Sequence, residues 1–166
     1  MFGDDLFDEC VEAIENWMPD DFANEKAYQN DLRELLFETI GKDNDINVKL
    51  ENSRSLCDIA VGRLVGIELK YGKGGKISKS EIDRLHGQVA GHTKEYSEGV
   101  IVVLVGDVNK YSEADVKDKL RDLYNSINNR NIFDEYSMKL INKSKEKIKI
   151  QKKKESSNNE KEDWFF

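Results

Sequence analysis

The chain has 166 residues, which is enough for one domain with its own hydrophobic core and short for two. Charged residues make up 36% and hydrophobic residues 38% of it, as is typical of a soluble globular protein, and no run approaches the ~20 apolar residues of a membrane-spanning helix. The acidic N-terminus lacks the basic and apolar regions of a signal peptide, so we expect a cytoplasmic location.

The net charge of −7 is distributed unevenly along the chain. Residues 1–45 carry 14 acidic and 3 basic side chains, residues 46–141 carry 14 and 15, and residues 142–166 carry 5 and 8. Because the acidity is concentrated in the N-terminal third, the overall charge does not exclude a phosphate-binding face elsewhere.

The N-terminal third predicts two amphipathic helices. Apolar residues recur at helical spacing over residues 6–17, and Pro19 ends this first helix. Asp20 and Asp21 can cap a second helix, and Gly41 supplies its stop.

Alternating and apolar segments then predict strands separated by helices. A glycine-rich loop at residues 72–76 precedes a predicted helix from about residue 80 to 98. The unbroken apolar run of residues 100–105 indicates a central strand covered on both faces. Before that loop, short turns join three strands into an antiparallel meander, at residues 46–50, 56–62 and 64–71.

The remaining segments complete the order ααβββαβαβ, a mixed α/β domain over residues 1–141. Ser112 and Asp115 form a capping box for a further helix, and residues 136–140 alternate as a last strand. Residues 142–166 are lysine-rich, then polar and acidic with terminal aromatic residues, and are predicted to be a tail with little structure of its own.

Three charged residues in otherwise apolar strands carry the strongest chemical signal. Glu68 and Lys70 project from the same side of their strand, and a hairpin can bring Asp58 beside Glu68. Burying such charges costs several kcal/mol per ion unless they are paired or bind a metal. A Mg²⁺ ion held by the carboxylates would stabilise charge on a phosphate, with Lys70 beside it. The competing interpretation is a structural Glu68–Lys70 pair with Asp58 in an unrelated turn contact.

The pattern Asp58-x9-Glu68-Leu69-Lys70 on adjacent strands resembles the PD-(D/E)xK nuclease superfamily, over roughly residues 20–106. The resemblance implies a restriction-endonuclease-like αβββαβ core, with an extra N-terminal helix and a C-terminal αβ extension. It also implies cleavage of phosphodiester bonds with Mg²⁺ or Mn²⁺. Asp58, Glu68 and the Leu69 carbonyl would be metal ligands and Lys70 the catalytic lysine. Cys57 stands where the motif has proline.

Two further positions match places that members of this superfamily use near the metal. Glu25 lies early in the helix before the first strand, and Gln88 lies in the helix after the lysine-bearing strand. Each of these two side chains is equally compatible with a solvated position on its helix. Gln88 shares the helix face of Leu85 and His92, which would direct it inward.

Basic residues after the predicted catalytic strand are candidates for contact with a nucleic-acid backbone. Lys73 and Lys76 lie in the glycine-rich loop, and Arg84 and Lys94 extend the same predicted surface. A solvated loop is the alternative. The lysine-rich run of residues 145–154 has two similar interpretations: it contacts DNA, or it only keeps the segment soluble.

Cysteine and histidine give no sequence signal for a zinc site. Cys10 and Cys57 lie in apolar segments at no metal-binding spacing, and we interpret them as reduced core thiols. His86 and His92 are six residues apart, share no helical face and have no cysteine partner in the sequence, so we do not expect them to bind zinc.

These residues together predict a Mg²⁺-dependent deoxyribonuclease acting in DNA repair, recombination, replication or defence. The sequence leaves open whether it is an endonuclease or an exonuclease, whether RNA is cut, and whether a homodimer supplies two active sites. The alternative is a non-catalytic nuclease-fold module that binds nucleic acid or a protein partner, which the acidic N-terminal third favours. The terminal Trp164–Phe166 either docks on a partner or packs back onto the domain.

Overall fold

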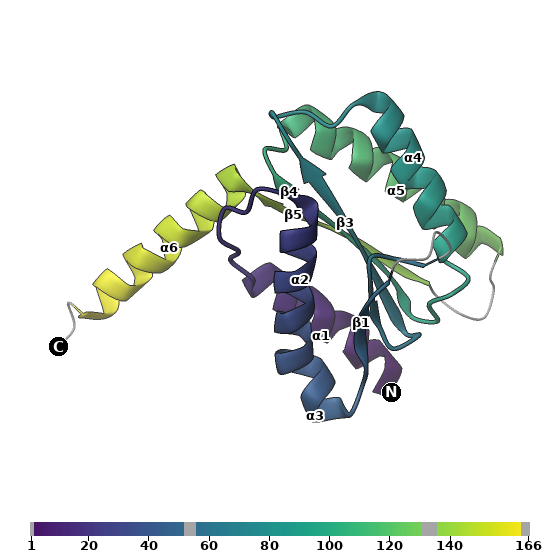
Figure 1. Cartoon of the computed structure of the whole chain (residues 1–166), viewed down its shortest axis with the longest axis horizontal. Helices are drawn as coiled ribbons and strands as arrows, with labels where there is room; N and C mark the ends of the chain where they lie inside the picture. The colour runs from purple at the N-terminus through teal and green to yellow at the C-terminus, as the bar shows by residue number, and fades with distance from the viewer. Residues whose placement is uncertain (1, 52–55, 131–135, 164–166) are drawn as a thin grey trace.

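The computed structural model describes residues 2–51, 56–130 and 136–163, in which helices flank an open mixed sheet (Figure 1). Five strands among these residues form one sheet in the order β1-β2-β3-β4-β5. The first three pair antiparallel, as the predicted meander requires, and β4 and β5 run parallel to β3. The strands are β1 (Val48–Leu50), β2 (Ile59–Val61), β3 (Val65–Gly72), β4 (Gly99–Gly106) and β5 (Ser137–Ser144).

Helices cover both faces of this sheet (Figure 1). Since β3, β4 and β5 follow one another without a reversal of direction across the sheet, right-handed crossovers place both connecting helices on one face. These crossover helices are α4 (Lys79–His92) and α5 (Lys110–Arg130). The opposite face is covered by α1 (Phe2–Asn16), α2 (Glu25–Leu36) and its continuation through the π-helical η1 (Phe37–Gly41) and α3 (Lys42–Asn44).

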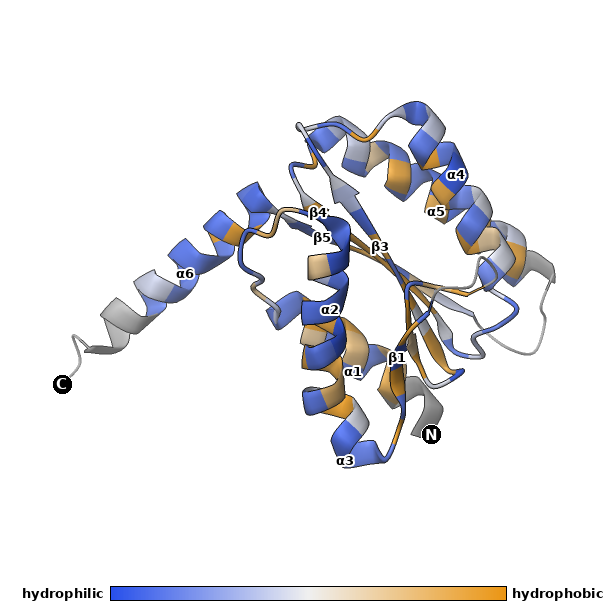
Figure 2. Ribbon diagram, in the orientation of Figure 1, coloured by the Kyte–Doolittle hydropathy of each residue, from blue (hydrophilic) through white to orange (hydrophobic). Residues whose placement is uncertain are grey.

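The two faces carry separate apolar clusters. All eight residues of β4 are buried, which confirms the prediction of a central strand covered on both sides. Figure 2 shows the apolar stripes of α4 and α5 turned toward the sheet and their polar stripes turned away. The cluster under α1 and α2 includes Ile14, Leu32, Leu36, Ile67, Ile101 and Val103. The cluster under α4 and α5 includes Leu85, Val89, Val102, Leu104, Val116 and Leu120.

The second helix begins and ends later than predicted. Asn24, not Asp20 or Asp21, is its N-cap, because the Asn24 side chain accepts the Ala27 amide at 2.9 Å. Gly41 does not stop it. A Cβ at Gly41 would lie 2.8 Å from a backbone oxygen of the returning chain, so glycine serves close packing here rather than a helix end.

Tertiary contacts also shift the ends of α4 and α5. Residues 93–98 leave α4 to contact the β2–β3 turn, where the Ser97 amide donates to the Arg63 carbonyl at 3.1 Å. The start of α5 lies at Asn109, whose side chain accepts the Ser112 amide at 2.9 Å. The Ser112 hydroxyl accepts the Ile77 amide at 3.0 Å, so the serine ties α5 to the loop before α4 instead of capping the helix.

The C-terminal segment departs from the predicted tail. Residues 142–144 belong to β5, and α6 (Lys145–Asp163) projects away from the sheet (Figure 1). Buried Lys143 donates to the Glu15 carbonyl and to Gln151, and Lys145 pairs with Asp21 at 3.0 Å. These contacts anchor the base of α6, and its run of good helix-forming lysines continues the helix from there. Trp164–Phe166 lie outside the described residues.

None of the helices in the described part of the chain has the length and apolar character needed to cross a membrane.

Close approach of β4 to β5 makes Gly99 the most size-restricted position of the sheet. A Cβ at Gly99 would overlap the Ser137 carbonyl oxygen, so Gly99→Ala is expected to lower the free energy of unfolding by about 1–3 kcal/mol. Gly87→Ala is the matched control, because Gly87 lies in α4 with open space around it and should gain about 0.5–1 kcal/mol. Urea unfolding of both variants measures the difference. Equal stability of the two would contradict this packing.

Candidate active site at the divergence of β2 and β3

The predicted catalytic residues lie at the start of β2, beyond which β3 continues without β2 and stays paired only with β4. The pairing of these strands ends at Ile59 and Ile67, so the later amides of β3 have no β2 partner. The Leu69 amide instead donates to Asp58 Oδ2 at 2.8 Å, and the Tyr71 amide donates to Glu25 Oε2 at 3.2 Å. Two carboxylates from separate elements therefore occupy the edge that a longer β2 would have filled.

Asp58 and Glu68 lie side by side, as the hairpin argument predicted. Glu68 is buried on the face of β3 that α4 covers, while Asp58 is partly buried just before β2. Burial and then the neighbouring Glu68 carboxylate raise the pKa of Asp58 from its ordinary value to about 7. The Leu69 amide acts in the opposite direction. The two carboxyl groups interact directly, which is the arrangement that a shared cation relieves.

Glu25 joins this pair from the first turn of α2. Burial is the main cause that raises its pKa, Glu68 adds to the rise, and the Tyr71 amide, Lys70 and Arg84 oppose it. The Glu25 carboxyl also accepts a hydrogen bond from buried Gln29 at 3.4 Å. The structure therefore brings Glu25 to the Asp58–Glu68 pair. Gln29 supports the Glu25 carboxyl, and its position four residues later on the same helix is a sequence signal that could have identified it.

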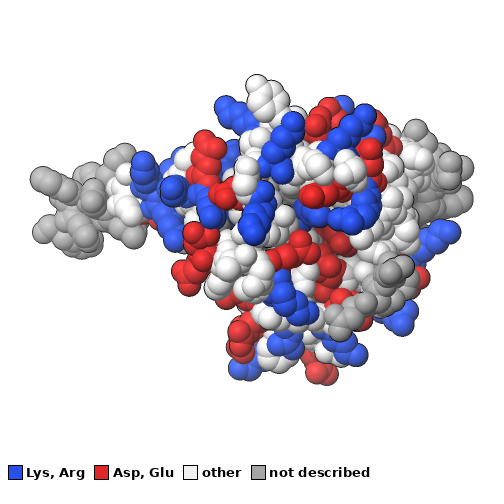
Figure 3. Space-filling model, turned by 45° about the horizontal axis from the view of Figure 1, so that its top comes forward, with Lys and Arg blue, Asp and Glu red and all other residues white. Residues whose placement is uncertain are grey.

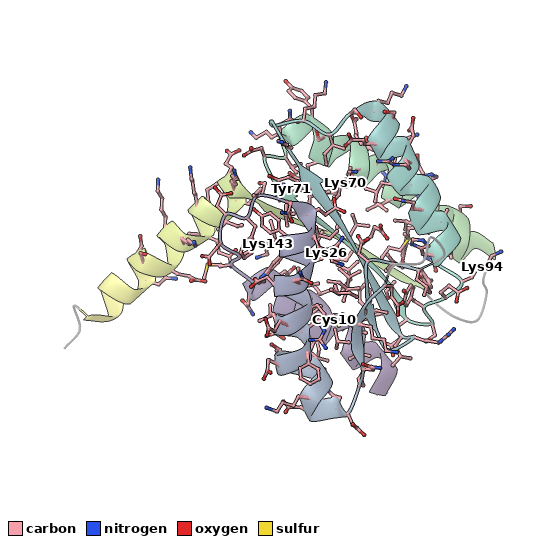
Figure 4. All side chains as sticks on the ribbon, in the orientation of Figure 1. Cys10, Lys26, Lys70, Tyr71, Lys94 and Lys143 are labelled. Carbon is pink, nitrogen blue, oxygen red and sulfur yellow. The ribbon has the colours of Figure 1, made fainter. Side chains whose placement is uncertain are left out.

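Lys70 projects from the same side of β3 as Glu68 and approaches the acidic cluster. Its ammonium group lies 3.6 Å from Glu81 Oε2 in the first turn of α4, and its side chain is only 17% exposed. Figure 4 shows Lys70 beside Tyr71 near the end of β3, close to the start of α2. Lys70 is close enough to lower the pKa of Glu25, whereas the Glu68 carboxylate raises the pKa of both Glu25 and Asp58. This excess of neighbouring carboxylates favours a divalent cation.

The donor set of this cluster fits a hard metal ion. Glu68 Oε2 is buried without a hydrogen bond among the described residues, with His92 Nδ1 3.2 Å away, and a metal ion would compensate its negative charge. Since the N–H and C=O of one strand residue point to the same edge, the Leu69 carbonyl faces the side on which its amide meets Asp58. Carboxylate and carbonyl oxygens are the ligands that Mg²⁺ prefers.

Gln88, the second position suggested by the resemblance, does not join the acidic cluster. Gln88 is exposed on α4, and the described polar contacts of the cluster do not include it. The inward orientation expected for it is not observed, because Leu85, Val89 and His92 take the buried face of the helix.

The four predicted basic contacts divide between the two ends of α4. Lys73 and Lys76 are exposed in the loop that follows β3, and Arg84 is close enough to lower the pKa of Glu25. Lys94 instead follows the last residue of α4 and lies at the opposite end of that helix from Lys70 (Figure 4). Figure 3 shows basic and acidic side chains interspersed on this face rather than one continuous basic surface.

A second set of polar side chains lies buried directly behind Glu68. His92 Nδ1 is 3.2 Å from Glu68 Oε2 and 3.6 Å from Cys57 Sγ, and the Tyr96 hydroxyl accepts the Cys57 amide at 3.0 Å. The expectation that His92 has no cysteine partner is therefore wrong, because α4 packs antiparallel over β3 and closes a 35-residue separation. Cys57 and Cys10 are both buried and outside any disulfide, as predicted.

Comparison of the chain with protein-family models, with curated proteins and with solved structures finds no match. The assignment of a function therefore depends on the geometry of the site.

Proposed function

We propose that this protein is a Mg²⁺-dependent deoxyribonuclease that hydrolyses phosphodiester bonds. The observation that carries the proposal is that Asp58, Glu68 and Glu25 meet at the point where β2 and β3 separate, with Lys70 close enough to act on Glu25. Two adjoining carboxylates with a partly buried lysine one position beyond Leu69 supply the groups that metal-assisted phosphodiester hydrolysis needs.

The order of elements around the site supports the same proposal. The segment from α2 through β1, β2 and β3 to α4 and β4 has the αβββαβ order of the restriction-endonuclease-like core. Asp58 lies just before its second strand and Glu68 on its third. In this proposal α1 is the extra N-terminal helix, and α5 with β5 is the C-terminal extension.

Asp58, Glu68 and the Leu69 carbonyl are the groups that would hold the metal ion. When bound, Mg²⁺, for which Mn²⁺ can substitute, lowers the pKa of a bound water and offsets negative charge on the scissile phosphate. The Leu69 and Tyr71 amides hold Asp58 and Glu25 in place before any ion binds, so the ligands need little rearrangement.

Lys70 and Glu25 complete the proposed chemistry. The Lys70 ammonium can orient the attacking water and neutralise charge on the phosphate as the bond breaks. Glu25, hydrogen-bonded to the backbone beside Lys70, would attract that cation and add negative charge at the metal side. Lys73 and Lys76 follow the same end of β3 and Arg84 acts on Glu25, and in this proposal the three contact DNA phosphates.

A cleavage assay tests this proposal directly. Purified protein is incubated with linear, single-stranded and four-way-junction DNA and with RNA, each with Mg²⁺, Mn²⁺ or EDTA. We expect DNA cleavage that requires the metal and is lost in Asp58→Ala and Lys70→Ala. Metal-dependent cleavage that survives both substitutions would overturn the site assignment. Binding of DNA without cleavage in any metal would favour the non-catalytic module instead.

Glu25→Gln is expected to slow cleavage by about 10- to 100-fold while leaving the fold intact. The amide keeps the hydrogen bond from the Tyr71 backbone but loses the charge that acts on Lys70 and the metal. Single-turnover cleavage rates measure the effect. Glu34→Gln, an exposed position on the same helix, is the control and should cut at the wild-type rate. Equal rates for the two variants would remove Glu25 from the site.

A further inference from the structure

The buried group behind Glu68 has the composition of a transition-metal site rather than of a magnesium site. One ligand atom each from Cys57, Glu68 and His92 lies within 4.8 Å of the other two, and all three side chains are buried. Sulfur, imidazole nitrogen and carboxylate oxygen are the ligands of tetrahedral Zn²⁺, whereas Mg²⁺ takes oxygen almost alone. We propose that Cys57, Glu68 and His92 form a second metal site, selective for Zn²⁺ or a similar borderline-soft ion.

The distances between these atoms match a tetrahedral ion. Bonds of about 2.3 Å to sulfur and about 2.0 Å to nitrogen or oxygen separate neighbouring ligand atoms by about 3.3 to 3.6 Å. The observed separations are 3.6 Å from Cys57 Sγ to His92 Nδ1 and 3.2 Å from His92 Nδ1 to Glu68 Oε2. The third separation, between the Cys57 sulfur and a Glu68 oxygen, is within 4.8 Å, so a tetrahedral ion above the plane of the three atoms would draw these two closer, with water as the fourth ligand.

The surroundings of the group argue for the same ion. Glu68 Oε2 is buried without a hydrogen bond among the described residues, and it lies 3.2 Å from His92 Nδ1, a distance that two ligands of one ion would share. The Tyr96 hydroxyl holds the Cys57 backbone and so fixes the position of the sulfur. Binding displaces the thiol proton of Cys57 to solvent, which compensates the burial of the ion with a thiolate.

Glu68 belongs both to this group and to the proposed magnesium site, so the two ions compete for it. This step rests on the proposed nuclease function. A zinc ion bound to Cys57 and His92 draws the Glu68 carboxylate away from Asp58 and removes a magnesium ligand. The site then makes the enzyme sensitive to zinc, with Zn²⁺ as an inhibitor of Mg²⁺-supported cleavage.

Cobalt spectroscopy tests the site without reference to cleavage. Co²⁺ titrated into the reduced, metal-free protein is expected to give tetrahedral visible bands and a thiolate-to-cobalt charge-transfer band, at one ion per chain, and Zn²⁺ is expected to displace it. Cys57→Ala should abolish the charge-transfer band, and His92→Gln should weaken Co²⁺ binding by at least about 10-fold. Cys10→Ala is the matched control, because Cys10 is equally buried but lies on the other face of the sheet, and it should keep the band.

The outcomes separate the zinc site from the nuclease proposal. Absence of the charge-transfer band in the wild-type protein, or its loss in Cys10→Ala but not in Cys57→Ala, overturns the zinc site. Where Cys57→Ala fails to fold by circular dichroism, His92→Gln and the rise in melting temperature of the wild-type protein with Zn²⁺ decide instead. A band without cleavage of any substrate leaves the zinc site standing and removes the nuclease function.

Cleavage then tests the competition. In a reaction supported by Mg²⁺, added Zn²⁺ is expected to slow the wild-type protein and Cys10→Ala by at least about 10-fold. For Cys57→Ala the ratio of rates with and without Zn²⁺ should be near one. Equal inhibition of Cys57→Ala and the wild-type protein would show that zinc acts at the oxygen ligands alone, and would overturn the competition.

Discussion

Asp58→Asn is expected to abolish cleavage and, at the same time, to stabilise the metal-free protein at pH 8. The loss of activity should reach at least about 10³-fold, since the substitution removes the charge of a proposed metal ligand. The gain in stability has a different origin. Asp58 is a carboxyl group held against Glu68 in a partly buried position, where its ionised form is unfavourable.

The pH dependence of this stabilisation follows from the pKa of Asp58. That pKa is raised from 3.8 to about 7 in the folded protein, mainly by burial and then by Glu68. Between these values the unfolded chain has lost the Asp58 proton while the folded protein retains it, so stability falls as the pH rises through this window. Asparagine does not ionise and keeps the acceptor for the Leu69 amide.

The variant should therefore equal the wild-type protein near pH 4 and exceed it by roughly 1–3 kcal/mol at pH 8 without metal. Thermal unfolding at both pH values measures the difference, as a rise in melting temperature of about 3 to 10 °C at pH 8. Mg²⁺ should reverse the order, because only the wild-type protein gains stability from binding it. Asp43→Asn, an exposed position on α3, is the control. Equal stability at pH 8 would contradict the carboxylate pair.

Lys70→Met is expected to lower the rate of cleavage by about 10² to 10³-fold while Mg²⁺ binding persists. Methionine keeps the length of the side chain in its partly buried position but removes the ammonium group that approaches Glu25 and Glu81. Loss of that positive charge beside the carboxylates should leave the affinity for Mg²⁺ equal or higher. A purely structural role of the Lys70–Glu81 ion pair does not predict this result.

Single-turnover rates at saturating Mg²⁺, together with calorimetric titration of Mg²⁺, separate these two effects. Lys42→Met on α3 is the matched control, because Lys42 is an exposed lysine that also pairs with a glutamate, Glu38, away from the end of β3. It should cut at the wild-type rate. A Lys70→Met rate within about threefold of wild type would exclude Lys70 from the chemical step.

Local patterns were sufficient for most of the sheet. The run from Val100 to Val105 can only be satisfied by a strand covered on both faces, and the structure buries all of it. Charged residues inside the apolar segments at Asp58 and Glu68 similarly indicated a polar site, because such charges need a partner. Alternation along β3 then correctly placed Glu68 and Lys70 on one side of the strand.

Helix ends were predicted less well, because several neighbouring residues can each cap or end a helix. Asn24, Asp20 and Asp21 are all good N-caps, and the choice of Asn24 depends on where α2 meets the sheet. Glycine often ends a helix, but glycine is required at position 41 because the Ile46 backbone oxygen approaches too closely for a side chain. The helix α6 has too few apolar residues for a periodic signal, and contacts of Lys143 with α1 anchor its start.

The sequence by itself determined the order of the elements up to residue 141 and the charged trio of Asp58, Glu68 and Lys70, because strand alternation and local hydrophobicity act over a few residues. Only the tertiary structure decided which other groups meet this trio. Packing of α2 brings Glu25 to the Tyr71 amide, and packing of α4 over β3 brings His92 to Cys57. Such contacts depend on how helices cross the sheet, which no local pattern of residues encodes.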